Sequence, residues 1–133
     1  MIKREGFTLL ELMIVIVIIG ILASIAVPTY IRVKQRAYKA EALASLSATR
    51  QSEYRYHLEK NVYTATLTAL DFDPASDVKG TLHFVYTAVA AGTGDTATFT
   101  ITATRNTVDG GVITDSVTID QDGDIGGTGI FAP

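Results

Sequence analysis

The residue with the clearest chemical potential is Glu11, because it is the only ionisable side chain between residues 7 and 28. A carboxylate costs about 2.5–3.5 kcal/mol at the middle of a membrane and less near the interface. Some other group has to offset that cost. Two interpretations stay open: Glu11 lies at the headgroup level of an ordinary anchor, or it pairs with a positive group of another chain.

The remaining polar residues offer little for catalysis. The chain contains no Cys, which excludes disulfides, thiol nucleophiles and Cys-ligated metals. Its two histidines, His57 and His83, lack a paired Asp and Ser constellation, so surface or packing roles are favoured. We therefore expect a protein that is not an enzyme and has no cofactor.

One acidic stretch resembles a calcium loop, with Asp120, Asp122 and Asp124 at alternate positions. A calcium loop needs Gly at its sixth position and Glu at its twelfth, where this chain has Ile125 and Phe131. The pattern therefore favours an acidic turn over a metal site. Several glycines follow without a helix pattern or a Lys, which predicts a flexible tail rather than a phosphate loop: Gly123, Gly126, Gly127 and Gly129.

Charge divides the 133 residues into unlike parts, although the length suits one small domain. Residues 1–6 carry a net charge of +1, residues 29–60 carry +4, and residues 61–133 carry −7. Between the first two lies the nearly uncharged segment that contains Glu11.

Residues 7–27 are almost wholly apolar and form a helix about 31 Å long, enough to span a membrane. Gly20 and Pro28 are weak points of this helix. Residues 29–60 lack Pro and Gly and are rich in helix formers, so the helix continues as an amphipathic half and stops at Lys60-Asn61. We expect its buried stripe to consist of Val33, Ala37, Ala40, Ala44, Ala48 and Leu58.

Residues 61–80 lack periodicity and predict a connecting loop with one short helical turn. In residues 81–133 the period changes to two, with alternating runs at 82–88, 97–104 and 113–119 and a Gly-rich turn at 92–95. Such a small antiparallel meander must pack against the second half of the helix. The predicted fold class is therefore α+β.

The N-terminal third closely resembles the class III signal and first helix of type IV pilins. The residues that carry the resemblance are Lys3-Arg4-Glu5-Gly6-Phe7-Thr8-Leu9-Leu10-Glu11-Leu12, followed by apolar residues 13–26 and Pro28. Beyond residue 40 the likeness is only architectural. It implies that residues 1–6 are a leader, which a membrane prepilin peptidase removes after Gly6 before Phe7 is N-methylated.

The resemblance also implies a homopolymer, built by assembly machinery in the inner membrane from precursors held in lipid. The resulting pilus is extracellular, and the small head favours a major subunit. The charges of these residues predict a mechanism, in which the new amine of Phe7 pairs with Glu11 of a subunit already in the filament. The segment from Gly20 to Pro28 is expected to extend or melt within the filament.

Two other functions remain open. A pseudopilin of a type II secretion system shares the leader and helix, and bound calcium at Asp120–Asp124 would favour it. An ordinary secreted or anchored β-rich binding module would follow from cleavage after Ser24-Ile25-Ala26. Nucleic-acid binding is not expected, because the basic residues at 32–39 lack an aromatic platform.

The uneven charge leads to one further expectation. The basic stretch at residues 29–60 should contact the acidic heads of neighbouring subunits in a staggered stack, and these contacts should weaken with salt.

Overall fold

The structure is a computed structural model that describes residues 6–74, 83–106 and 114–132. Its elements are helix α1 (Leu9–Lys60) and strands β1 (Phe84–Ala91), β2 (Thr98–Arg105), β3 (Ser116–Asp120) and β4 (Ile125–Thr128). Three 3₁₀ turns occupy Leu67–Ala69, Gly94–Thr96 and Gly129–Phe131. The chain forms two compact units, Met1–Arg36 and Ala37–Pro133.

Helix α1 begins at Leu9, two residues later than predicted. Thr8 explains the difference, because its hydroxyl Oγ1 accepts the backbone N–H of Glu11 at 3.1 Å. Side-chain capping of this kind holds the preceding residue outside the helix. The helix then runs without interruption through Pro28, as the length and composition predict.

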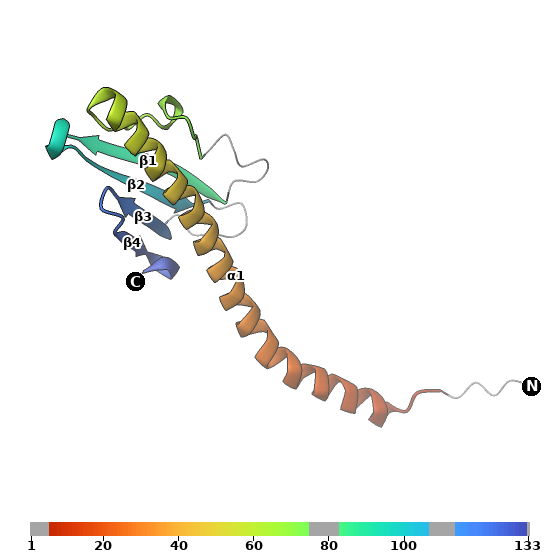
Figure 1. Ribbon diagram of the computed structural model, residues 1–133. Coiled ribbons are helices and arrows are strands. Elements are labelled where there is room, and N and C mark those ends of the chain that lie inside the picture. The colour runs from red at the N-terminus through yellow and green to blue at the C-terminus, as the bar shows by residue number, and fades with distance from the viewer. Residues whose placement is uncertain (1–5, 75–82, 107–113, 133) are drawn as a thin grey trace, which may run out of the picture. The chain divides into compact units, whose positions relative to one another are not determined.

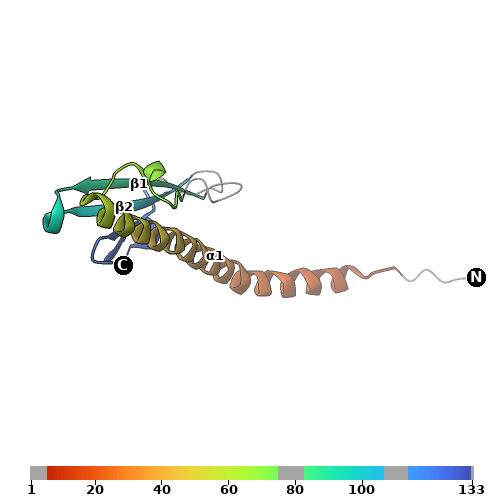
Figure 2. The same cartoon turned by 45° about the horizontal axis from the view of Figure 1, so that its top comes forward.

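The second unit is a two-layer α+β head, which confirms the predicted fold class. The four strands pair antiparallel in the order β1-β2-β3-β4, and the C-terminal half of α1 packs on one face of this sheet (Figures 1 and 2). Inward residues alternate along β1, β2 and β3 as predicted, and they are fully or largely buried at Phe84, Tyr86, Phe99, Ile101, Ala103, Val117 and Ile119. Leu82 and Ile113 lie outside the described residues.

The predicted buried stripe of α1 is wrong. Leu58 is 85% exposed, and the alanines and valine of that stripe are exposed or half-buried. The buried face consists instead of Tyr38, Ala42, Leu46, Thr49, Ser52 and Glu53. Large side chains decide the orientation, because Tyr38 and Leu46 remove far more area from water than an alanine does. Polar residues complete the face, and a search for an apolar stripe does not detect them.

The predicted end of the helix is confirmed, since α1 stops at Lys60 and Asn61 adopts a left-handed φ of 59°. The loop that follows contains the expected single turn at Leu67–Ala69. The predicted hairpin turn is also present, with φ of 77° at Gly92 and 59° at Gly94. Residues 75–80 of the loop lie outside the described part of the chain.

The predicted flexible tail is wrong, because residues 125–131 form strand β4 and a 3₁₀ turn. The glycines permit close packing here. A Cβ on Gly126 would stand 2.6 Å from the hydroxyl Oγ1 of Thr118, and one on Gly127 would overlap the carbonyl of Phe131. Glycine content alone does not distinguish a mobile tail from a tightly packed strand.

Candidate functional site

The peptide bond between Gly6 and Phe7 precedes the first turn of α1 in non-helical backbone. Both residues are exposed, Phe7 to 82%, and a Cβ built on Gly6 would meet no atom within 4 Å. This bond is therefore accessible to a protease. Residues 1–5 lie outside the described part of the chain.

Glu11 lies in the first turn of α1, and Thr8 of the same chain caps this turn. Its N–H donates to Thr8 Oγ1, and the N–H of Leu12 donates to the Thr8 carbonyl at 3.2 Å. The carboxylate is near the positive end of the helix dipole, where negative charge is favourable. The sequence Thr8-Leu9-Leu10-Glu11 has the spacing of a capping box, which is the local signal for this start of the helix.

The apolar half of α1 has no partner in the described structure. Every large hydrophobic residue from Leu9 to Val33 is about half exposed or more. By length and composition this helix can cross a membrane. Its surface is suited to lipid or to a second apolar helix rather than to water.

Backbone hydrogen bonding weakens between Gly20 and Pro28. Pro28 has no N–H to offer the carbonyl of Ser24, and the hydroxyls of Ser24 and Thr29 donate instead to Ile21 and Ile25 carbonyls at 2.7 and 2.9 Å. The segment remains helical in this structure.

The head is closed by its C-terminal segment instead of a disulfide. Phe131 is 2% exposed within the core, and its carbonyl accepts a hydrogen bond from Lys39 Nζ at 3.4 Å. Buried Asp115 accepts the N–H of Ile130 at 3.1 Å. Gly129 has φ of 63° and would press a Cβ into the Asp115 carboxylate, so only glycine fits there.

The acidic turn after β3 is organised by its own backbone. Asp120 Oδ1 accepts the N–H groups of Asp122, Gly123 and Asp124 at 3.0, 3.0 and 2.9 Å. Across the described residues, no three His, Cys, Asp or Glu side chains are placed to hold a metal ion. The turn is joined to α1 by Arg50, whose Nε and Nη2 donate to the Gln121 carbonyl at 3.2 and 2.9 Å.

Besides Asp115, two residues with a carboxyl or guanidinium group are buried among the described residues of the head, Glu53 and Arg105. Glu53 is fully buried; its Oε2 accepts the Thr64 N–H at 3.0 Å, while Oε1 has no partner within the described chain. Burial raises the pKa of the Glu53 carboxyl, and the hydrogen bond from Thr64 opposes this only in part. The Arg105 guanidinium lies 3.8 Å from the centre of the Tyr38 ring.

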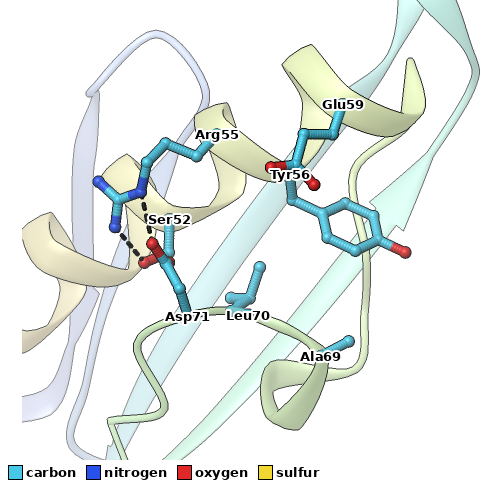
Figure 3. Close-up of a pocket in the computed structure, with 7 residues that line it drawn as sticks. All are labelled: Ser52, Arg55, Tyr56, Glu59, Ala69, Leu70 and Asp71. Carbon is cyan, nitrogen blue, oxygen red and sulfur yellow. Dashed lines mark hydrogen bonds and ion pairs between the residues drawn. The ribbon is translucent and has the colours of Figure 1, made fainter.

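A small pocket of about 150 Å³ separates α1 from the following loop (Figure 3). Arg55 Nε contacts Asp71 Oδ2 at 2.6 Å, and Arg55 Nη2 donates to the Ser52 hydroxyl at 3.0 Å. Hydrogen bonds from Arg55 and Ser52 lower the pKa of Asp71 to about 2. The remaining lining residues are Tyr56, Glu59, Ala69 and Leu70. The Arg55–Asp71 ion pair therefore acts as a clamp, because it ties the loop that carries Asp71 to helix α1.

The histidines have the packing roles that were expected. The His57 ring stacks on Tyr63 with centroids 4.4 Å apart, and its Nε2 is 3.2 Å from the Gly94 carbonyl. His83 Nδ1 lies 3.0 Å from Glu41 Oε1.

Comparison with known families assigns both parts of the chain. A motif described as the prokaryotic N-terminal methylation motif matches residues 1–27, and a family described as type IV minor pilin ComP, DNA uptake sequence receptor, matches residues 28–115. The chain belongs to this family of type IV pilins. The pilin is 40% identical to the type IV major pilin protein PilE1 of Neisseria gonorrhoeae, over 58% of its own length and 36% of that relative.

Other relatives come from two systems. The type IV major pilin protein PilA of Myxococcus xanthus is 40% identical over 54% of this chain and 33% of its own length. The type II secretion system core protein G of Aeromonas hydrophila is 42% identical over 52% and 48%, respectively. The pilin thus spans between a third and a half of these relatives. No solved structure matches it.

Proposed function

We propose that this pilin is cut between Gly6 and Phe7 by a prepilin peptidase, N-methylated at Phe7, and polymerised into an extracellular type IV pilus. The leading support is the exposed apolar half of α1, preceded by an accessible peptide bond and carrying Glu11 in its first turn. The methylation motif over residues 1–27 supports the same processing. The role is structural, with no catalytic activity of its own.

Assembly follows from the position of the new amine. After cleavage, Phe7 carries a positive charge only four residues before Glu11 in the sequence. The amine of an incoming subunit pairs with Glu11 of its neighbour, and this attraction strengthens as water is excluded. Lipid gives little hydrophobic drive for helix association, so the ion pair and close packing supply the specificity and the axial register.

Before assembly, the precursor is held in the inner membrane by residues 7–28, where the assembly machinery collects it. Extraction of α1 from lipid exchanges tail contacts for contacts with other copies. The weakened backbone between Gly20 and Pro28 allows the helix to extend within the filament. Residues 37–132 then form the head that faces the outside.

Two measurements test this function together. Mass spectrometry of the mature chain should find methylated Phe7 at its N-terminus, whereas Val27 would indicate a released module. Electron microscopy of sheared surface fibres should find filaments that disappear with Glu11→Ala and persist with Glu59→Ala, the control at an exposed glutamate of the head. Normal polymerisation of the Glu11→Ala variant contradicts the ion-pair mechanism.

A pseudopilin of a type II secretion system is the second candidate, favoured by the 42% identity to core protein G. Long surface fibres separate a pilus from a short periplasmic pseudopilus. Calcium binding provides a second test. The Asp120 carboxylate is already committed to its own turn through three N–H groups, so a pilin is not expected to bind calcium there. Stoichiometric calcium binding at this turn would favour the pseudopilin.

We propose no DNA-receptor role for residues 61–133 of this pilin. DNA phosphates are recognised largely by Lys and Arg, and residues 61–133 contain only Lys79 and Arg105. Arg105 is 6% exposed and covered by Tyr38. Salt-sensitive binding of duplex DNA by the pilin would contradict this interpretation.

A further inference from the structure

Arg32 and Arg36 are exposed cations on the part of α1 that precedes the head. In the described structure neither makes an ion pair or a hydrogen bond. In contrast, Lys39, Arg50 and Arg55 all donate to groups of their own head. Arg32 and Arg36 are therefore available to a second molecule.

Exposed acidic residues lie at one end of the head. The β1–β2 hairpin contains Asp95, and the β3–β4 turn contains Asp122 and Asp124; both connections leave the same end of the antiparallel sheet. Helix α1 also finishes at this end, because the Gly94 N–H donates to the Asn61 carbonyl at 2.9 Å. Figure 1 shows both connections at that end of the sheet.

The cations near this end do not cancel its charge. There are two such cations among the described residues: Arg50, which donates to the neutral Gln121 carbonyl, and Lys60, the last residue of α1. Asp122 accepts only the neutral amide of Gln121 at 2.8 Å, and Asp124 has no side-chain partner in the described chain. With Asp95 and Asp120, four carboxylates outnumber the two cations, so the end of the head is acidic.

We propose that the segment around Arg32 and Arg36 of one copy docks against the acidic end of the head of another copy, formed by Asp95, Asp122 and Asp124. The inference rests on the proposed filament, in which all copies point the same way. In such a filament, the end of one copy's head at which α1 finishes faces the next copies along the filament. There it meets the part of their α1 that precedes the head. The partner is a second copy of this chain, recognised by charge.

This contact supplements the buried ion pair at the N-terminus. The exposed charges attract over roughly 8–10 Å at physiological salt, which guides docking and favours one orientation. Val33, which is 57% exposed between the two arginines, adds apolar area to the same surface.

Charge reversal in the full chain tests the proposal through fibre yield by electron microscopy and immunoblotting of sheared material. Arg36→Glu should lower the yield about threefold or more, and adding Asp124→Arg should restore most of it. The matched control adds Glu41→Arg instead, which restores net charge at the other end of the head, where Glu41 lies beside His83 and the start of β1, and it should not rescue.

Each result decides the matter. Rescue by Asp124→Arg alone supports the contact, whereas a normal yield for Arg36→Glu, or equal rescue by both second changes, overturns it. Wild-type fibres provide a test without substitutions, because raising salt from about 50 to 500 mM should loosen them; salt-insensitive fibres contradict the contact. Absence of wild-type fibres would instead refute the proposed function itself.

Discussion

Replacing Phe131 with alanine should destabilise the head by about 3–5 kcal/mol. The side chain is 2% exposed, and its ring centroid lies 6.0 Å from that of Phe84. A buried phenylalanine removes about 150–250 Å² of surface from water, which at about 25 cal/mol per Å² corresponds to roughly 4–6 kcal/mol. Alanine keeps the Cβ, so the lower part of that range applies.

The assay is denaturant unfolding of the full chain in detergent, followed by the near-ultraviolet circular dichroism of its tyrosines. The control is Ile130→Ala, which removes a neighbouring side chain that is 43% exposed and should cost less than about 1 kcal/mol. If Phe131→Ala also cost less than about 1 kcal/mol, the C-terminal segment would not close the head. Its role in place of a disulfide would then be refuted.

Three further predictions concern the same head. Gly129→Ala should destabilise more than Gly94→Ala in urea unfolding, because both have positive φ but only at Gly129 would the Cβ strike a carboxylate; equal effects would contradict the close approach. For Glu53 the folded-state pKa is raised, so stability should be highest below the ordinary glutamate pKa and fall as pH rises through the raised value. Glu53→Gln should remove that slope in melting curves from pH 4 to 8, and an unchanged slope would assign it to another group. Asp71 has the opposite sign: its pKa of about 2 means that the clamp with Arg55 contributes above the ordinary value and is lost as pH falls towards 2. Asp71→Asn should remove this low-pH component with little change at pH 7, because the pair is exposed; a large loss at neutral pH would contradict the interpretation.

Local patterns in the sequence were sufficient to predict several features. The length of the apolar run indicated a helix long enough to cross a membrane, and the change of period from helix to strand indicated an α+β head. Lys60-Asn61 marked the end of the helix, and the glycines at 92 and 94 marked the hairpin. Each of these depends on the chemistry of neighbouring residues, which is readable without knowledge of distant contacts.

Distant contacts decided the rest. Alanines can face either the sheet or the solvent, so the orientation of α1 depended on how Tyr38 and Leu46 fill the space above the strands. The glycines near residue 127 were compatible with a loose tail until their closeness to β3 and Phe131 was known. Nothing in the local pattern marks Glu53 as buried, because its surroundings come from the loop and the strands. The sequence alone therefore determined the long helix and the first three strands, whereas the tertiary structure determined strand β4 and which faces are buried, since both depend on residues brought together from far apart in the chain.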